Sequence, residues 1–146
     1  MLAVSNTLLS RVDPTGERQA MISRKNSKGL RVGQALSIYA YNNYPAPTPI
    51  SVFSGYLIGI KRSGVESSLR IRSRVMRIGT EMRFPVFSPT IKEIRVIKET
   101  PPKKIRRAKL FYMRDEKHDR GSVDAILKAD RERREVSEKS AKASKK

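Results

Sequence analysis

The stretch LRIRSRVMRI, residues 69–78, constrains the fold most strongly, because it alternates arginine with other residues and contains no acidic side chain. In a β-strand successive side chains point to opposite faces, so the first three arginines would share one face and the residues between them the other. Between Val75 and Met76 the alternation changes phase, which we interpret as a β-bulge or register break within one strand. Ordinary protein surfaces mix both signs of charge, so a face with arginine alone indicates a charged partner.

Four other segments have the length and composition of short β-strands. Gly55 and Gly59 interrupt the second of them, and glycine inside a strand is typical of bends in tightly curved sheets. In the last segment, Leu110 and Tyr112 share the face that we expect to be buried. Five short strands at this spacing predict a mostly-β fold, a small SH3-like or OB-type β-barrel. The four segments are ALSIYAY at 35–41, SVFSGYLIGI at 51–60, IKEIRVIK at 91–98 and KIRRAKLFYM at 104–113.

Both ends of the chain predict helices. Near the start, Asp13 has the residue type of an N-cap, Pro14 suits the first helical position, and Gly29 would lie beyond the end of this short helix. After Arg114 the composition changes to charged residues of both signs with strong helix formers, which predicts a mostly solvated helix that ends in a lysine tail. We therefore expect three parts: an N-terminal extension with a short helix at 1–28, a β-barrel domain at 29–114, and a charged helix and tail at 115–146.

Positive charge is concentrated in one region of the chain. The net charge is +18, and residues 61–114 alone hold sixteen Lys and Arg against four Glu, a net +12. So strong an excess repels itself in an isolated fold, so we expect a polyanionic partner, either nucleic acid or an anionic membrane. The C-terminal helix offers only three apolar residues to a membrane, at Val123, Ile126 and Leu127. Nucleic acid is therefore the favoured partner.

The residues needed for catalysis or metal binding are scarce. His118 is the only histidine and lies in the polar run KHDR, so we expect it to be solvated rather than to act as a general base. The chain has no cysteine, no G-x-S-x-G nucleophile motif and no Walker motif. We predict no enzymatic activity, no cofactor and no metal site. Four isolated glutamates are instead expected to pair with nearby arginines: Glu66, Glu81, Glu93 and Glu99.

The basic residues fit the chemistry of RNA binding. The run KKIRRAK, residues 103–109, holds five basic residues in seven, and arginine can grip phosphate oxygens through two donors at once. No helix-turn-helix, zinc finger or paired RNP aromatics are present, so we expect folded RNA to be recognised through its backbone and shape. A solvated charge run or a localisation signal remains the alternative for KKIRRAK. The candidate RNA-binding residues are Lys61, Arg62, Arg70, Arg72, Arg74, Arg77, Arg83, Lys103, Lys104, Arg106, Arg107, Lys109 and Arg114.

Four motifs carry a resemblance to a known family. GLRVGQALSIYAY, VFSGYLIGIKRSG, MRIGTEMRFPVFSPTIKEIRVIK and KIRRAKLFYMRD follow one another in the order and spacing of bacterial-type ribosomal protein L-nineteen (L19), over about residues 29–115. The resemblance implies a small β-barrel of the large ribosomal subunit, packed against ribosomal RNA near the face that meets the small subunit. It also implies neighbours of the L-three and L-fourteen types and a contribution to an intersubunit bridge, with contact to small-subunit RNA.

Three features differ from the bacterial pattern of this family. Ser54 replaces an acidic residue of the second strand, the loop at 44–49 is rich in proline, and the ending after Arg114 is longer and more mixed in charge. These differences resemble an organellar member, so we favour the mitochondrial ribosome, with the bacterial cytoplasm as the alternative. The first twelve residues lack acids, as targeting segments do, but they are too short and weakly basic to predict one.

Two functional hypotheses follow. The first is a structural constituent of the large ribosomal subunit that binds and packs ribosomal RNA through its arginine- and lysine-bearing strands and loops. The second is a free-standing RNA-binding β-barrel that acts as a ribosome assembly or translation factor. One copy per mature subunit would favour the first, and enrichment on precursors the second. Under either hypothesis we expect Arg72 and Arg74 to point away from the core, so that their loss would weaken RNA binding without unfolding the protein.

Overall fold

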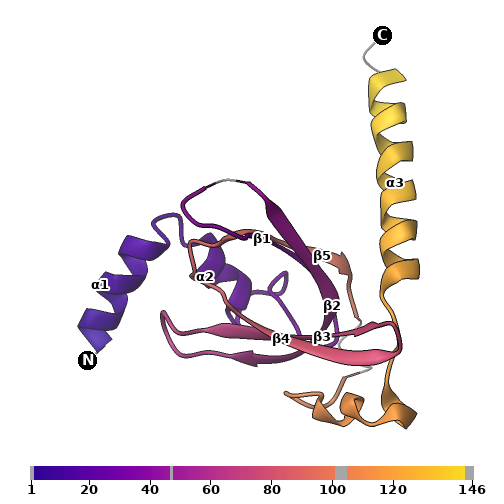
Figure 1. Ribbon diagram of the computed structural model, residues 1–146. Helices are drawn as coiled ribbons and strands as arrows, with labels where there is room; N and C mark the ends of the chain where they lie inside the picture. Colours follow the sequence, from indigo (N-terminus) through magenta and orange to yellow (C-terminus); the bar gives the residue numbers. More distant parts are fainter. Residues whose placement is uncertain (1, 47, 101–104, 144–146) are drawn as a thin grey trace.

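The fold is built on one antiparallel sheet of five strands in the order β4-β3-β2-β1-β5 (Figure 1). The structure is a computed structural model that describes residues 2–46, 48–100 and 105–143. Strand and helix bounds are as follows: α1 Leu2–Val12, α2 Glu17–Ile22, β1 Ala35–Tyr41, β2 Ile50–Lys61, β3 Ser68–Val75, β4 Ile78–Pro85, β5 Ile91–Lys98, the 3-10 helices η2 Phe111–Arg114 and η3 Glu116–His118, and α3 Asp124–Ala143.

The long strand β2 makes the sheet curl. Its first half pairs with β1 and its second half pairs with β3, and the register with β3 shifts between Leu57 and Gly59. A side chain at Gly55 could not be accommodated, because a Cβ atom there would lie 2.5 Å from the carbonyl oxygen of Arg72. The two halves of β2 therefore run in different directions, and the sheet folds back so that β1 and β5 face β3 and β4 (Figure 1).

The curled sheet encloses the main hydrophobic core. Leu36 and Ile38 of β1 and Leu69 and Ile71 of β3 are fully buried within it. Among the described strands, β4 and β5 form the two edges and no ladder joins them. The prediction of a mostly-β fold is confirmed. The prediction of an SH3-like β-barrel is not confirmed, because the sheet is not closed into a barrel.

Helix α2 is attached to the connection between β4 and β5. The guanidinium of Arg18 donates hydrogen bonds to the carbonyl oxygens of Val86, Ser88 and Ile91, at 3.0, 2.9 and 2.7 Å. Ile22, at the end of α2, is buried in the main core. The helix thus ties the loop that joins the two edge strands to the interior of the sheet.

The predicted N-terminal helix exists but is shorter than expected. It begins at Glu17 rather than at Pro14 and ends at Ile22. Asp13 still provides an acceptor for the first turn of this helix, because its carboxylate accepts a hydrogen bond from the backbone N–H of Gln19 at 2.9 Å. Helix α1, which precedes it, was not predicted.

The phase change in the arginine stretch is a chain reversal rather than a bulge. Val75 pairs with Ile78, and the two residues between them form a tight hairpin turn that joins β3 to β4. Both have positive φ, 48° at Met76 and 68° at Arg77, as a two-residue type I′ hairpin requires. The prediction of one continuous strand over residues 69–78 was wrong, because neither turn residue is the glycine or asparagine that usually marks such a turn.

The prediction of a strand at residues 104–113 is also wrong. Residues 105–110 form no regular element, and the chain then enters η2. One backbone hydrogen bond, from the N–H of Leu110 to the carbonyl oxygen of Ile58 at 2.8 Å, fastens this segment to β2. Leu110 is buried against Ile58 and Met113 as expected, but Tyr112 is 36% exposed. The segment covers the outer face of β2 around Ile58, so Leu57 and Ile58 are buried on opposite faces of the strand.

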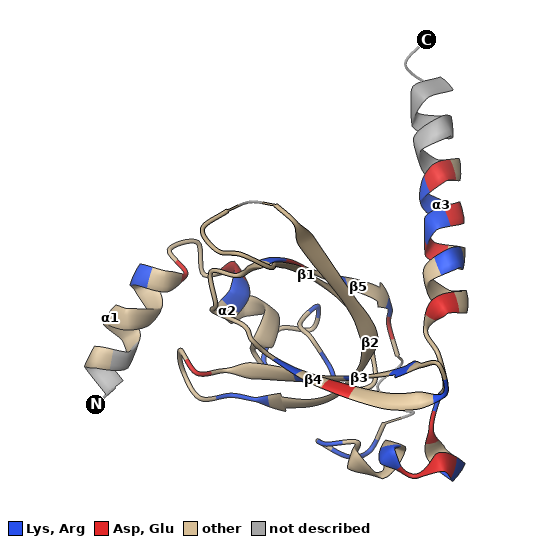
Figure 2. Ribbon diagram, viewed as in Figure 1, with Lys and Arg blue, Asp and Glu red and all other residues tan. Residues whose placement is uncertain are grey.

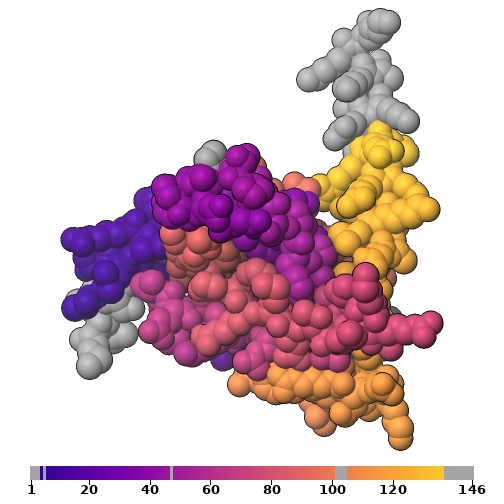
Figure 3. Space-filling view, in the orientation of Figure 1, coloured from indigo at the N-terminus to yellow at the C-terminus, as the bar shows by residue number. Residues whose placement is uncertain are grey.

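The helix predicted after Arg114 is present as α3. Val123, just before it, is buried, and the first turns of α3 lie against β5. Beyond these turns α3 extends away from the sheet (Figures 1 and 3). The lysines at its very end, residues 145 and 146, lie outside the described residues. Among the described helices, none combines the length and apolar character that crossing a bilayer requires.

Candidate nucleic-acid interface

Strand β3 separates its side chains as the alternation predicts. Leu69 and Ile71 are fully buried on the inner face, whereas Arg70, Arg72 and Arg74 share the outer face and are partly exposed. The three arginines have different surroundings, however. Two of them lie in a network of carboxylates, and the third faces a hollow that is lined by other cations.

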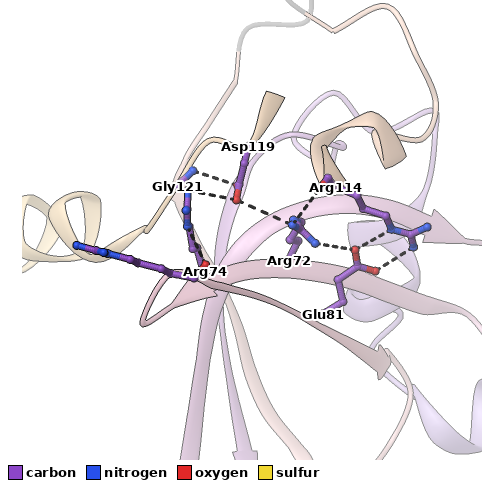
Figure 4. A network of polar contacts seen from close by, with 7 residues as sticks. Arg72, Arg74, Glu81, Arg114, Asp119 and Gly121 are labelled. Atoms are coloured by element: carbon purple, nitrogen blue, oxygen red, sulfur yellow. Dashed lines mark hydrogen bonds and ion pairs between the residues drawn. The ribbon is translucent and has the colours of Figure 1, made fainter. Parts of the chain in front are cut away.

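Glu81 and Asp119 neutralise part of the arginine face (Figure 4). Glu81 on β4 binds Arg72 at 3.2 Å and accepts two hydrogen bonds from Arg114, at 2.8 and 3.0 Å. Asp119 lies 3.9 Å from Arg72 and 3.8 Å from Arg74. The hydrogen bonds from Arg114, followed by the positive charge of that residue and of Arg72, hold the pKa of Glu81 below its usual range even though burial opposes the shift.

Arg72 therefore has a structural role. Its side chain is only 12% exposed, and its guanidinium occupies the space above Gly79, where a Cβ atom would lie 2.4 Å from a guanidinium nitrogen. The expectation that Arg72 could be removed without affecting the fold is not supported by this environment. In the hairpin register Arg72 stands directly opposite Glu81. A correct prediction of the turn would have identified the pair from the sequence.

A first hollow is lined by basic side chains, with no carboxylate among its described lining residues. It has a volume of about 490 Å³ and lies between the end of β2, the outer faces of β3 and β4, and the segment before η2. Among the described residues that line it, Lys61 alone is ion-paired, 3.9 Å from Glu66 in an exposed pair. We name it the Phe111 hollow, and its lining residues are Gly59, Ile60, Lys61, Arg62, Ser68, Arg70, Arg83, Lys109 and Phe111.

A second hollow of about 410 Å³ adjoins the first, since Ile60 and Arg62 line both. It adds Arg24, Arg31 and Arg107, again with no carboxylate among its described lining residues. Burial, and then the like charge of Arg24, lowers the pKa of Arg62. We call the cations of the two hollows the basic surface: Arg24, Arg31, Lys61, Arg62, Arg70, Arg83, Arg107 and Lys109.

The structure divides the predicted RNA-binding residues into groups. Six of them belong to the basic surface, and Arg72, Arg74 and Arg114 belong to the carboxylate network. Arg77 is exposed at the β3–β4 turn and Arg106 is exposed before η2, whereas the adjacent Lys103 and Lys104 lie outside the described residues. Sequence reasoning missed Arg24 and Arg31, which the fold of the N-terminal segment brings to the surface. Figure 2 shows that acidic residues gather instead around η3 and along α3.

Aromatic rings lie among the cations. Phe111 is 37% exposed, and the charged groups of Arg114, Arg70 and Lys109 lie 4.6, 5.4 and 5.7 Å from the centre of its ring. The guanidinium of Arg107 lies 5.9 Å from the ring centre of Tyr112. Such contacts are typical of surfaces that combine charge with stacking.

The described residues contain no cluster of three or more His, Cys, Asp or Glu side chains that could hold a metal ion. His118, the only histidine, lies in η3 with its ring edge against Tyr112, 5.6 Å between ring centres. Three of the four isolated glutamates have basic partners: Glu81 pairs with two arginines, Glu93 with Arg95, and Glu66 with a lysine rather than an arginine.

Comparison with known proteins gives a consistent result. The family model for ribosomal protein L19 matches residues 15–125. The large ribosomal subunit protein bL19m of Schizosaccharomyces pombe is 35% identical over 118 residues, 80% of this chain and 65% of the relative. The bL19m protein of Neurospora crassa is 35% identical over 128 residues, 88% of this chain and 46% of the relative. The bL19 protein of Treponema denticola is 32% identical over 109 residues, 75% of this chain and 89% of the relative. The chain thus spans about two thirds and about half of the two bL19m proteins.

Proposed function

The chain belongs to the ribosomal protein L19 family, and we propose that it is a structural constituent of the large subunit of the mitochondrial ribosome that binds ribosomal RNA through its basic surface. Proteins of this family are structural components of the ribosome rather than enzymes. The mitochondrial assignment is supported by the two bL19m relatives, each of which matches 80% or more of this chain.

The absence of carboxylates from the two adjoining hollows carries the RNA-binding proposal. The fold places Glu81 and Asp119 against Arg72, Arg74 and Arg114, and it places no described acid in either hollow. The basic surface therefore keeps most of its positive charge, since among its described cations Lys61 alone is ion-paired, with the exposed Glu66. Its members repel one another until an anion lies against them. Ribosomal RNA supplies such an anion, because phosphates recur along its backbone at a spacing that several side chains can contact together.

We extend the proposal to the organisation of the chain. Residues 29–114 would provide the RNA-binding unit, to which Arg24 of the N-terminal extension adds one cation. The rest of the flanking parts, at 1–28 and 115–146, would contact neighbouring components of the subunit. By family resemblance those neighbours include proteins of the L-three and L-fourteen types, with contact to small-subunit RNA at the intersubunit face. The length of α3 beyond the sheet supports a role in contacts outside the basic surface (Figure 3).

The test is a salt titration of RNA binding with two charge-matched variants. The first variant carries Arg62→Gln, Arg83→Gln and Lys109→Gln on the basic surface. The second removes the same number of charges from exposed positions of α3, with Lys128→Gln, Arg131→Gln and Arg133→Gln. Affinity for large-subunit ribosomal RNA is measured by filter binding from low to high salt.

We expect the first variant to bind more weakly and to lose about one unit of log–log salt slope for each phosphate contact removed. The α3 variant should keep most of the slope. Equal losses in both variants would contradict a localised RNA-binding surface. Cosedimentation of the wild-type protein with mature large subunits at one copy each is the second requirement, and a protein found only on precursors would instead be an assembly factor.

A further inference from the structure

We propose that the Phe111 hollow binds a single unpaired nucleotide of ribosomal RNA, with the base against the Phe111 ring and the adjoining phosphate on the surrounding cations. This inference rests on the proposed function and makes it more specific. It states that one point of the basic surface recognises a nucleotide that has left its helix, whereas the rest of the surface contacts the RNA backbone.

The shape of the site is the first argument. A duplex presents a convex backbone, which would touch the rim of a concave hollow without filling it. The hollow has a volume of about 490 Å³, within the range of sites that enclose small organic ligands. An unstacked nucleotide is such a ligand, and single-stranded loops and bulges are the parts of RNA whose bases can be turned outward into a protein.

The inner side of the hollow is the second argument. Gly59 has no side chain, and the space beside it is bordered by the Phe111 ring and the aliphatic stem of Lys109, which a Cβ atom would meet at 3.8 and 4.0 Å. Phe111 as a residue is 37% exposed, and the guanidinium of Arg70 already lies over its ring, 5.4 Å from the ring centre. Aromatic rings and guanidinium planes are the groups on which proteins stack unpaired bases.

The orientation of two arginines is the third argument. Arg62 donates its Nε–H to the carbonyl oxygen of Ile22 at 2.6 Å, and Arg83 donates its Nε–H to the hydroxyl of Ser68 at 2.9 Å. No bond from the terminal Nη groups of either arginine to a described residue is present. Each guanidinium is thus held in place through Nε while its two terminal Nη groups have no acceptor among the described residues, an arrangement that suits bidentate phosphate binding.

The surroundings of Arg72 show why the proposed site lies at Arg70 and not further along β3. Arg72 lies two residues after Arg70 on the same face, but its guanidinium binds Glu81 and lies 3.9 Å from Asp119. The positive charge of Arg72 is already paired with these carboxylates, whose negative charges would repel the phosphate of a nucleotide. Of the arginine face, the end at Arg70, beside Lys109 and Phe111, is therefore the part suited to a ligand.

The experiment uses the full chain and two hairpin RNAs that differ by one nucleotide. One hairpin is fully paired, and the other contains a single bulged 2-aminopurine whose fluorescence reports on stacking. A purine probe is appropriate because stacking on an aromatic ring tolerates every base. The protein variants are Phe111→Ala, Phe111→Leu, which keeps an apolar side chain but removes the ring, and Tyr112→Ala as the matched control. Tyr112 lies in the same turn of η2 and is exposed to the same degree, 36%.

We expect the wild-type protein to prefer the bulged hairpin and to change the 2-aminopurine fluorescence on binding. Phe111→Ala and Phe111→Leu should each reduce affinity for the bulged hairpin about tenfold, the effect of losing one base–aromatic stack, and leave affinity for the paired hairpin unchanged. Tyr112→Ala should keep the preference. Circular dichroism is the control that checks whether each variant is folded.

Two results would overturn the inference while leaving the proposed function in place. The first is equal binding of both hairpins with no fluorescence change, in a protein that still loses affinity on the triple substitution of Arg62, Arg83 and Lys109. The second is a preference for the bulge that survives Phe111→Leu, since the ring would then not be the group that contacts the base. Loss of all RNA binding by the wild-type protein would instead contradict the proposed function itself.

Discussion

Arg114 binds Glu81 through two parallel hydrogen bonds, 2.8 Å from Nε and 3.0 Å from a terminal guanidinium nitrogen, although 33 residues separate them. The pair joins the end of η2 to the outer face of β4 (Figure 4). Together with the buried side chain of Leu110, it holds the segment before α3 against the sheet. The same contact sets a carboxylate against the positive charge of Arg114, which distinguishes this residue from the cations of the two hollows.

Replacing Glu81 by glutamine should destabilise the protein in a pH-dependent way. The hydrogen bonds from Arg114 lower the pKa of Glu81 in the folded state, so ionised Glu81 stabilises the fold at pH values above its unfolded pKa of about 4.3. This contribution is lost as the pH falls through the lower folded value. Urea unfolding should show a deficit of about 1 kcal/mol for Glu81→Gln at neutral pH that shrinks as the pH falls below about 4.

Glu93→Gln is the matched control for this measurement. Glu93 pairs with Arg95 on the same strand, two residues away, and it is 46% exposed against 23% for Glu81. Its loss should change stability by a few tenths of a kcal/mol at most, roughly the value of an exposed pair. A deficit for Glu81→Gln that is the same at neutral and acidic pH would show that its charge is not responsible.

Asp119→Asn should loosen the segment between η2 and α3. Asparagine can still accept the N–H of Gly121, which binds the Asp119 carboxylate at 3.1 Å, but it removes the negative charge that faces Arg72 and Arg74. We expect a loss of about 1–2 kcal/mol and faster hydrogen exchange for residues 111–121. Asp130→Asn, which breaks an i,i+4 pair with Arg134 on α3, should cost about 0.5 kcal/mol or less and leave that exchange unchanged. Exchange that is equally fast in both variants would contradict the role given to Asp119.

Leu110→Ala should be among the most destabilising substitutions in the segment before α3. Leu110 is 1% exposed and packs with Ile58 and Met113 in a small cluster on the outer face of β2. Removing its side chain should cost about 2–5 kcal/mol in urea unfolding, because the cluster is too small to close the cavity. Ala108, two residues earlier, is exposed, and Ala108→Ser serves as a neutral control. A loss below about 1 kcal/mol for Leu110→Ala would mean that the segment contributes little to the fold.

Changing Met76 to asparagine and Arg77 to glycine should stabilise the protein. Both residues have positive φ, which costs ordinary side chains energy and which asparagine and glycine accept readily. The hydrogen bond from Arg74 Nε to the carbonyl oxygen of Arg77 involves the backbone and can be retained. We expect a gain of about 1–2 kcal/mol in thermal or urea unfolding. An unchanged or lower stability would show that the exposed Met76 side chain makes a compensating contribution.

The strand pattern was predictable where it depends on local alternation, and it failed where the chain turns. ALSIYAY and IKEIRVIK became β1 and β5 with the predicted bounds, because a strand's two-residue period is visible in its own residues. The turn at Met76 and Arg77 lacks the usual turn residues, so the change of phase looked like a bulge. KIRRAKLFYM alternates poorly, and the burial of Leu110 against β2 decided its path instead.

The sequence by itself determined the chemistry of this protein: its family, its excess of positive charge, and the face of β3 on which three arginines stand. These properties depend on residue types and on neighbours along the chain. Only the tertiary structure decided which of the described cations have a carboxylate against them. Arg72 and Arg114 are paired with an acid because the hairpin register and the path of η2 bring Glu81 between them, whereas Arg24 and Arg62 come together in a hollow with no acid among its described lining residues. Electrostatic interactions act over distances of a few ångströms in space, and which charges lie that close is set by folding rather than by their order in the chain.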